Sequence, residues 1–459
     1  MKKIILFVPF ILWCFFGFAQ QEITGDWYGQ LNVQGMQLQL IFHIAHGENG
    51  YTTTMDSPDQ GANGIPVSET NFANDSLHLN LTALNAAYKG RLQDSLSISG
   101  KFSQNGLNFP LNLSRKQKSK TAKAEAPKRP QEPKEPFPYV SEEVKFDNKK
   151  AKVSLAGTLT LPRKTGTFPA VILISGSGPQ NRNEELMGHK PFLVIADYLT
   201  RNGIAVLRYD DRGVGESTGK FKGATTYDFA ADAKAAIAYL KSRSEIDPDK
   251  IGLIGHSEGG MIAPLIASED KSIDFVVLLA APGLPIDKMM LLQKKGIEKK
   301  MGVPEAQINA GQKMNSELFA LVKSSKSGAV QTNLESYLTT HGIADDASRT
   351  QILQTFEDPW MQTFLKYDPQ PVLEKIDCPV LALNGSKDLQ VPATENLEAI
   401  RTAFSKSGNK NVTIKELPGL NHLFQHADTG LPSEYAEIEE TFSPQTLQLI
   451  KGWILGAVK

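Results

Sequence analysis

The chain has 459 residues, 22% of them charged, and a formal net charge of -1. This length is more than one ordinary hydrophobic core requires, and it predicts two domains. A charge this close to zero provides no long-range attraction to nucleic acid or to an anionic membrane. The composition therefore argues against a nucleic-acid partner and favours a small or neutral substrate.

The first 19 residues have the pattern of an export signal. Two lysines precede an apolar run at 4–18, and the small residue Ala19 fits a cleavage site. The run is too short to span a bilayer stably. We expect residues 1–19 to be a signal peptide, which predicts a secreted or periplasmic protein whose mature chain has no stable membrane span. A retained amino-terminal anchor is the alternative.

Residues 20–115 have the pattern of a small all-β domain. Apolar and polar residues alternate with period two at 37–42 and 77–81. Asn-Gly pairs such as Asn49-Gly50 and Asn105-Gly106 separate these stretches as turns. The prediction is an antiparallel meander that folds as a sandwich or a barrel.

Residues 116–138 consist largely of Lys, Ala, Glu and Pro. Such a composition cannot bury enough apolar surface to fold and predicts a semi-extended linker. The linker is the clearest domain boundary in the sequence.

From 139 to 459, apolar strand patterns alternate with helical ones, which predicts a mostly parallel sheet flanked by helices. The predicted strands are residues 170–174, 205–208, 251–254, 275–279, 380–383 and 412–416. The alternation stops at about 285–374, where Lys- and Met-rich helical sequence predicts an inserted helical cap.

The stretch Gly255-His256-Ser257-Glu258-Gly259 has the form G-x-S-x-G, with an apolar strand before it and a helix after it. A nucleophile on a sharp strand-to-helix turn has little room, so small residues are needed two positions on either side. The helix that follows points its amino terminus at the site and favours a developing oxyanion. We therefore predict Ser257 as a nucleophile.

A serine hydroxyl needs a base, and the base needs an acid that fixes its tautomer. Asp388 follows the strand at 380–383, and His422 follows the last predicted strand. Both lie in the chain order that a serine, acid and histidine triad uses in this type of fold. Two alternatives remain: His426 as the base, and a surface ion pair between Lys387 and Asp388.

An oxyanion hole requires two backbone donors. We expect one to be the amide of Glu258, the residue after the nucleophile. The other is expected from the loop after the first parallel strand, with Ser177 ahead of Gly178. No metal ligand set, dinucleotide motif or other cofactor signature is complete in the sequence, so no metal or cofactor is expected.

At these residues the chain resembles the α/β-hydrolase superfamily, specifically bacterial secreted carboxylesterases and serine-aminopeptidase-like hydrolases. The matching motifs are Ser175-Gly176-Ser177-Gly178-Pro179, Asp210-Asp211-Arg212-Gly213, Gly255-His256-Ser257-Glu258-Gly259-Gly260, Gly385-Ser386-Lys387-Asp388 and Gly419-Leu420-Asn421-His422. The resemblance implies a triad of Ser257, Asp388 and His422. It also implies that Asp211-Arg212-Gly213 is a structural turn. The chain departs from many relatives at Ser175, where they have His, and this leaves the second oxyanion donor open.

Three functions are compatible with this pattern. The first is a serine carboxylesterase that forms an acyl-enzyme on small-molecule esters. The second is a serine aminopeptidase, which would need a carboxylate for the α-amine of its substrate; Glu258, Glu298, Glu305 and Glu357 are candidates. The third is a binding protein in which the β domain holds glycan or lipid. The sequence does not indicate an oligomeric state.

Overall fold

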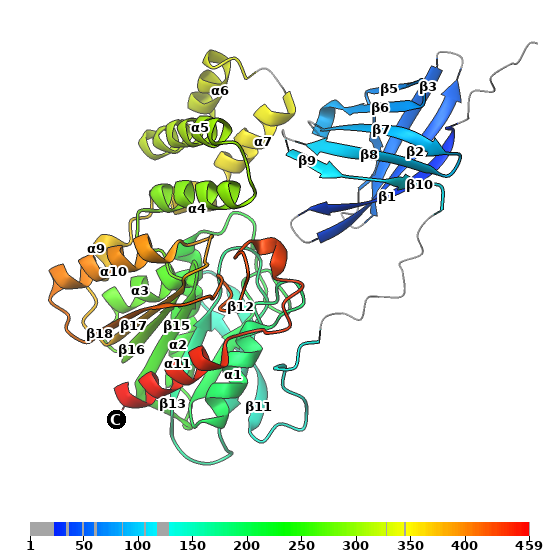
Figure 1. Cartoon of the computed structure of the whole chain (residues 1–459). Coiled ribbons are helices and arrows are strands. Elements are labelled where there is room, and N and C mark those ends of the chain that lie inside the picture. Colours follow the sequence, from blue (N-terminus) through cyan, green and yellow to red (C-terminus); the bar gives the residue numbers. More distant parts are fainter. Residues whose placement is uncertain are drawn as a thin grey trace, which may run out of the picture. The chain divides into compact units, whose positions relative to one another are not determined.

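The structure is a computed structural model that describes residues 23–33, 36–47, 50–58, 62–84, 86–104, 107–116, 128–326, 328–343 and 346–458. These residues divide into two compact units, one within 23–116 and one within 128–458 (Figure 1). The predicted signal peptide and linker residues 117–127 lie outside the described residues. In the described part of the chain, no helix is both long and apolar enough to cross a membrane.

The amino-terminal unit is all-β and antiparallel, in the sheet order β4-β3-β2-β1-β10-β8-β7-β6-β5, with β9 beside β8. Its strands are β1 (Gly25–Val33), β2 (Met36–Gly47), β3 (Gly50–Ser57), β4 (Ala62–Pro66), β5 (Glu69–Ala73), β6 (Ser76–Leu81), β7 (Ala86–Asp94), β8 (Ser97–Gln104), β9 (Leu107–Pro110) and β10 (Leu113–Ser114).

This sheet curls around a single apolar core. Side chains that alternate inward, among them Trp27, Phe42 and Tyr88, form one buried cluster. A side-chain hydrogen bond also joins the end strand β5 to β3, because the Thr70 hydroxyl donates to the Thr53 hydroxyl at 2.9 Å. The predicted all-β antiparallel domain is therefore present.

The carboxy-terminal unit has an eight-stranded sheet in the order β11-β12-β14-β13-β15-β16-β17-β18. Its strands are β11 (Val140–Asn148), β12 (Val153–Leu161), β13 (Phe168–Ile174), β14 (Ala205–Tyr209), β15 (Ile246–His256), β16 (Phe275–Leu279), β17 (Val380–Gly385) and β18 (Val412–Leu417). The six predicted strands correspond to β13 to β18, and these pair in parallel. The strands β11 and β12, which were not predicted from the sequence, form an antiparallel edge.

Helices cover both faces of this sheet and bury its apolar residues in two separate cores (Figure 1). One face is covered by α1 (Pro191–Arg201) and α11 (Pro444–Ala457). The other is covered by α2 (Thr226–Lys241), α3 (Gly259–Glu269) and α10 (Ala393–Ser407). The central strands are apolar on both sides because neither face meets water.

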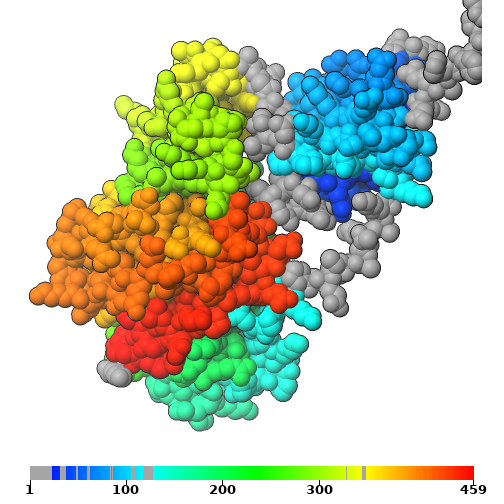
Figure 2. Space-filling view, in the orientation of Figure 1, coloured from blue at the N-terminus to red at the C-terminus, as the bar shows by residue number. Residues whose placement is uncertain are grey.

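A helical segment interrupts the sheet between β16 and β17. It contains α4 (Ile286–Lys300), α5 (Glu305–Ser324), α6 (Val330–Thr340), α7 (Asp346–Glu357), α8 (Pro359–Lys366) and α9 (Gln370–Leu373). In the space-filling view its green-to-yellow residues form a continuous mass against the orange part of the unit (Figure 2). Met289, Phe364 and Tyr367 are buried with Met261 of α3, so these apolar side chains of the segment belong to a core.

Part of the predicted linker is attached to the carboxy-terminal unit. The Arg129 guanidinium donates to the backbone oxygens of Ile438 at 2.6 Å and Ala436 at 2.9 Å. The Gln131 side chain donates to the Phe442 carbonyl at 2.6 Å. Polar side chains hold this stretch, which explains why it carries no apolar signal in the sequence.

The turn that the resemblance assigns a structural role, Asp211-Arg212-Gly213, is fastened to α2. Arg212 binds both carboxylate oxygens of Asp232, at 2.7 and 2.8 Å, and Asn148 donates to the same carboxylate. Asp232 is 1% exposed. Breaking a buried ion pair leaves an uncompensated charge, so the pair fixes the turn.

We predict that Asp232→Ala lowers the free energy of unfolding by about 3 kcal/mol, because it removes the buried carboxylate that binds the Arg212 guanidinium and leaves it only the more exposed Asp228, at 3.3 Å. Glu269→Ala is the matched control, since it removes an exposed carboxylate paired with Lys234 and is expected to cost less than about 1 kcal/mol. Urea denaturation of both variants measures the difference. Equal losses would contradict a structural role for the buried pair.

Candidate active site

Ser257 lies on the sharp turn between β15 and α3. Its φ is 54°, in the left-handed region that side chains rarely adopt, and its side chain is half-buried. A Cβ at Gly255 would lie 2.0 Å from the Gly259 oxygen, and a Cβ at Gly259 would lie 2.0 Å from the Ile174 oxygen. Both glycines are therefore required by close backbone approach, as the motif predicted.

Asp388 and His422 meet at the carboxyl ends of β17 and β18. The Nδ1 of His422 lies 2.8 Å from Oδ2 of Asp388, and both side chains are buried. The other oxygen of Asp388 accepts the amides of Gln390 and Val391. With Nδ1–H donating to this carboxylate, the Nε2 of His422 is left as the basic nitrogen.

The two sequence alternatives have other partners. His426 is exposed, and its Nδ1 lies 2.8 Å from a carboxylate oxygen of Glu440. The Lys387 ammonium group donates a hydrogen bond to the backbone oxygen of Ala427. Asp388 contacts His422, so the structure brings together the predicted acid and the predicted base.

The loop after β13 lies against the turn that carries Ser257. A Cβ at Gly176 would lie 3.1 Å from the Ser257 Cβ. The amide of Gly176 donates to Glu184 at 2.7 Å, but no described residue accepts the amides of Ser177 and Glu258. These two amides are the predicted oxyanion donors, and they are available to a bound molecule.

Two further buried groups surround the turn, and the sequence motifs did not assign a role to either. His256 is 6% exposed, and its ring centroid lies 4.8 Å from that of His422. Its Nδ1 lies 2.9 Å from Oε1 of Glu184, a residue 72 positions earlier in the chain. Burial lowers the pKa of His256, but the charge and hydrogen bond of Glu184 outweigh it and raise the pKa overall.

The side chain of Glu258 is also buried and occupied. Its carboxylate accepts the Thr226 hydroxyl at 2.6 Å and the Trp360 indole N–H at 2.9 and 3.1 Å. Burial raises the pKa of Glu258, although the hydrogen bonds from Thr226, Trp360 and Ser177 oppose this. Glu258 therefore connects α8 of the helical segment to the turn that carries Ser257.

Asp211 supports the loop that carries Ser177. It accepts the Ser175 hydroxyl at 3.1 Å and the Gln180 amide at 3.0 Å. Burial raises the pKa of Asp211 to about 8, and the nearby carboxylates of Glu258 and Glu184 act in the same direction. Within the described ranges, no three His, Cys, Asp or Glu side chains converge as a metal ion would require.

We predict that Gly259→Ala lowers the free energy of unfolding by at least about 2 kcal/mol, because the added methyl group would overlap the Ile174 carbonyl. Gly452→Ala is the control, since Gly452 lies at an exposed position of α11 and an added Cβ there meets nothing within 4 Å. That control is expected to gain about 0.5–1 kcal/mol from helix propensity. Thermal unfolding of both variants measures the effect, and a neutral Gly259→Ala would disprove the close approach.

The family model described as serine aminopeptidase, S33, matches residues 190–428. The esterase EstD of Thermotoga maritima is 29% identical over 304 residues, and the match covers 65% of this chain and 65% of EstD. The Bacillus subtilis hydrolase YtaP is 30% identical over 155 residues, 30% of this chain and 51% of YtaP. The chain thus spans less than two thirds of each relative's length.

Among solved structures, an esterase of Pyrococcus furiosus has a TM-score of 0.43 and 18% identity, covering 70% of this chain and 92% of that one. The family match spans more than half of the sequence and includes Ser257, Asp388 and His422. The predicted α/β-hydrolase resemblance is confirmed by this match. The chain therefore belongs to the serine aminopeptidase S33 family of serine hydrolases.

Proposed function

We propose that the protein is a carboxylesterase that hydrolyses small-molecule esters through Ser257, His422 and Asp388. The observation that carries the proposal is the buried pair of His422 and Asp388 beside the strained turn at Ser257. The similarity to EstD, which is named as an esterase, supports the reaction class. We further propose export by residues 1–19, on the sequence features described above.

In the proposed mechanism, the Ser257 hydroxyl attacks the ester carbonyl and gives its proton to Nε2 of His422. Asp388 stabilises the imidazolium that forms. The amides of Glu258 and Ser177 bind the oxyanion of the tetrahedral intermediate. The alcohol leaves with the proton from His422, and water then hydrolyses the acyl-enzyme by the same steps.

A neutral acyl group fits the site better than an α-amino acid. An aminopeptidase needs a carboxylate that is free to bind the substrate amine. Glu258 already accepts hydrogen bonds from Thr226 and Trp360, and Glu298 is paired with Lys294. Glu305 and Glu357, the remaining candidates from the sequence, are exposed on the helical segment. The family description keeps peptidase activity as the second candidate function.

We propose that the helical segment of α4 to α9 is a cap that shapes the acyl-binding side of the site. The support is its contact with the residue after Ser257, since Trp360 of α8 binds the Glu258 carboxylate. Trp360 also stacks on Phe364, with ring centroids 4.7 Å apart. An aromatic pair at this position would set how long an acyl chain the site accepts.

The first test is hydrolysis of p-nitrophenyl esters of increasing chain length beside aminoacyl anilides. We expect ester turnover by the intact protein and a loss of at least about 1,000-fold in Ser257→Ala. Ser268→Ala, which changes a serine at the far end of α3, is the matched control and should retain activity. Faster turnover of anilides than esters would favour the peptidase. Ester turnover that survives Ser257→Ala would refute the nucleophile.

The cap is tested by Trp360→Ala. We expect the ratio of kcat/KM for octanoate over acetate esters to change by about 10-fold, because the indole is replaced by open space. Trp453→Ala is the control, since Trp453 lies on α11 and packs on Phe275 of β16. The ratio is internal to each variant, so loss of stability does not affect it. An unchanged ratio in Trp360→Ala would show that α8 does not shape the acyl site.

A further inference from the structure

Glu184 holds an unusual place in the turn between β13 and α1. It is 4% exposed, and its φ of 49° lies in the left-handed region although it is not glycine. One carboxylate oxygen, Oε1, accepts two hydrogen bonds, from the Gly176 amide at 2.7 Å and from His256 Nδ1 at 2.9 Å. A strained, buried carboxylate persists only where its surroundings determine its position.

The second nitrogen of His256 extends this connection to the proposed base. Its Nε2 lies 3.0 Å from the backbone oxygen of His422. An ionised carboxylate and a carbonyl oxygen can only accept, so with Glu184 ionised both ring nitrogens donate, and we assign the ring as an imidazolium. The charged groups that face it are Glu184 and, farther away, Asp388, and both raise the pKa of His256.

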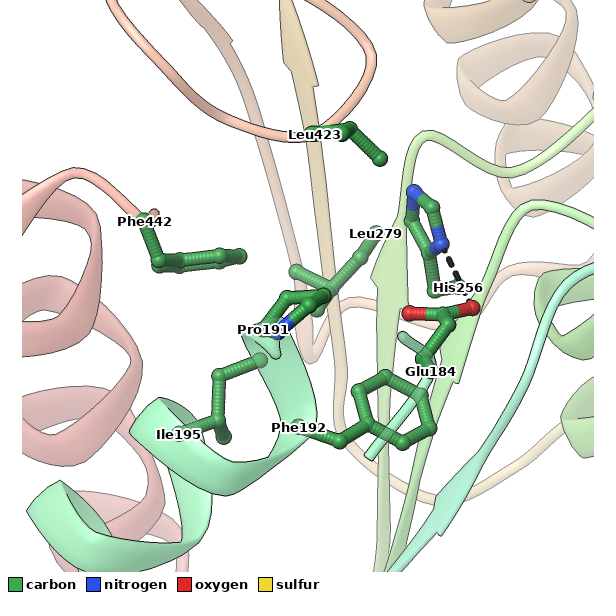
Figure 3. A pocket seen from close by; sticks show the side chains of 8 residues that line it. All are labelled: Glu184, Pro191, Phe192, Ile195, His256, Leu279, Leu423 and Phe442. Atoms are coloured by element: carbon green, nitrogen blue, oxygen red, sulfur yellow. Dashed lines mark hydrogen bonds and ion pairs between the residues drawn. The ribbon is translucent and has the colours of Figure 1, made fainter. Parts of the chain in front are cut away.

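The surroundings of this ion pair are apolar. Figure 3 shows Glu184 and His256 facing each other at the edge of a small pocket. Its other lining residues are Pro191, Phe192, Ile195, Leu279, Leu423 and Phe442. Charge-assisted hydrogen bonds are strong and directional in apolar surroundings, so they hold both partners in one geometry.

We propose that Glu184 is a positioning residue for the reaction: through Gly176 and the His256 imidazolium it fixes the oxyanion loop and the His422 backbone relative to Ser257. The proposal rests on the proposed function of the Ser257 site. Gly176 lies against the Ser257 side chain, and Ser177, the next residue, offers the second oxyanion donor. One carboxylate oxygen therefore controls two of the distances on which attack by Ser257 depends.

The test is the rate at which a fluorophosphonate labels Ser257 in the full chain. In this reaction the Ser257 oxygen bonds to phosphorus, fluoride leaves, and His422 takes the hydroxyl proton. Glu184→Gln keeps the shape and one acceptor oxygen, but it removes the negative charge that balances the His256 imidazolium, so His256 loses a proton and one of its two ring hydrogen bonds. We expect the maximal labelling rate to fall about 10- to 100-fold while the concentration for half-maximal rate stays constant.

Glu185→Gln is the matched control, because it makes the same change one residue away on an exposed side chain. It should label at the wild-type rate. A folded Glu184→Gln that labels at that rate would overturn the proposal, whatever the natural substrate is. Conversely, a wild type that labels but hydrolyses no ester would refute the esterase function and leave the role of Glu184 testable by the same rates.

A second set of variants covers the case in which Glu184→Gln does not fold. Glu184→Asp keeps the charge on a shorter side chain that cannot reach both donors, so we expect an intermediate labelling rate. His256→Asn should lower the rate as well. The Glu184→Asp, His256→Asn double variant should lose less than the two single losses combined, because the two changes share the Glu184–His256 contact and only Glu184→Asp also affects Gly176. Additive losses, or a wild-type rate in Glu184→Asp, would contradict the proposal.

Discussion

The tight turn at Ser257 is the constraint on which the rest of the unit depends. It holds a left-handed residue between β15 and α3, and it tolerates no Cβ at Gly255 or Gly259. The carbonyl of Ile174 approaches Gly259, so the end of β13 must lie beside the turn. The parallel pairing of β13 with β15 brings the two ends together and so permits this contact.

The sequence could predict this turn because the signal is local. Gly255, Ser257 and Gly259 lie within five residues, and Asp388 and His422 each follow an apolar strand. The missed strand β12 also had a readable signal, an alternation of Leu and Thr towards its end. Glu184 could not be found in this way. It belongs to no pattern, and its partner His256 is 72 residues away, so only the folded chain reveals the pair.

Charge in the site is balanced by pairing rather than by solvent. Asp388 faces His422 and Glu184 faces His256, and the two imidazole rings are 4.8 Å apart. Both carboxylates are buried, and a buried carboxylate without a hydrogen-bond donor would be destabilised. A second imidazolium beside the proposed base would oppose its protonation in the transition state. The Glu184 carboxylate counters this repulsion, because it balances the positive charge of His256 beside the His422 ring. In the proposed mechanism a second positive charge develops on that ring.

Glu258 joins the same site to the helical segment in a different way. Its backbone amide is free for the proposed oxyanion, while its side chain is held by Thr226 of α2 and Trp360 of α8. A displacement of α8 would pull on the residue that carries this amide. Because oxyanion stabilisation depends on donor distance, the position of the proposed cap and the reaction rate would be coupled through Glu258. Substrates that fit beneath α8 without moving Trp360 would then react fastest, so acyl size would be selected in kcat and not only in binding.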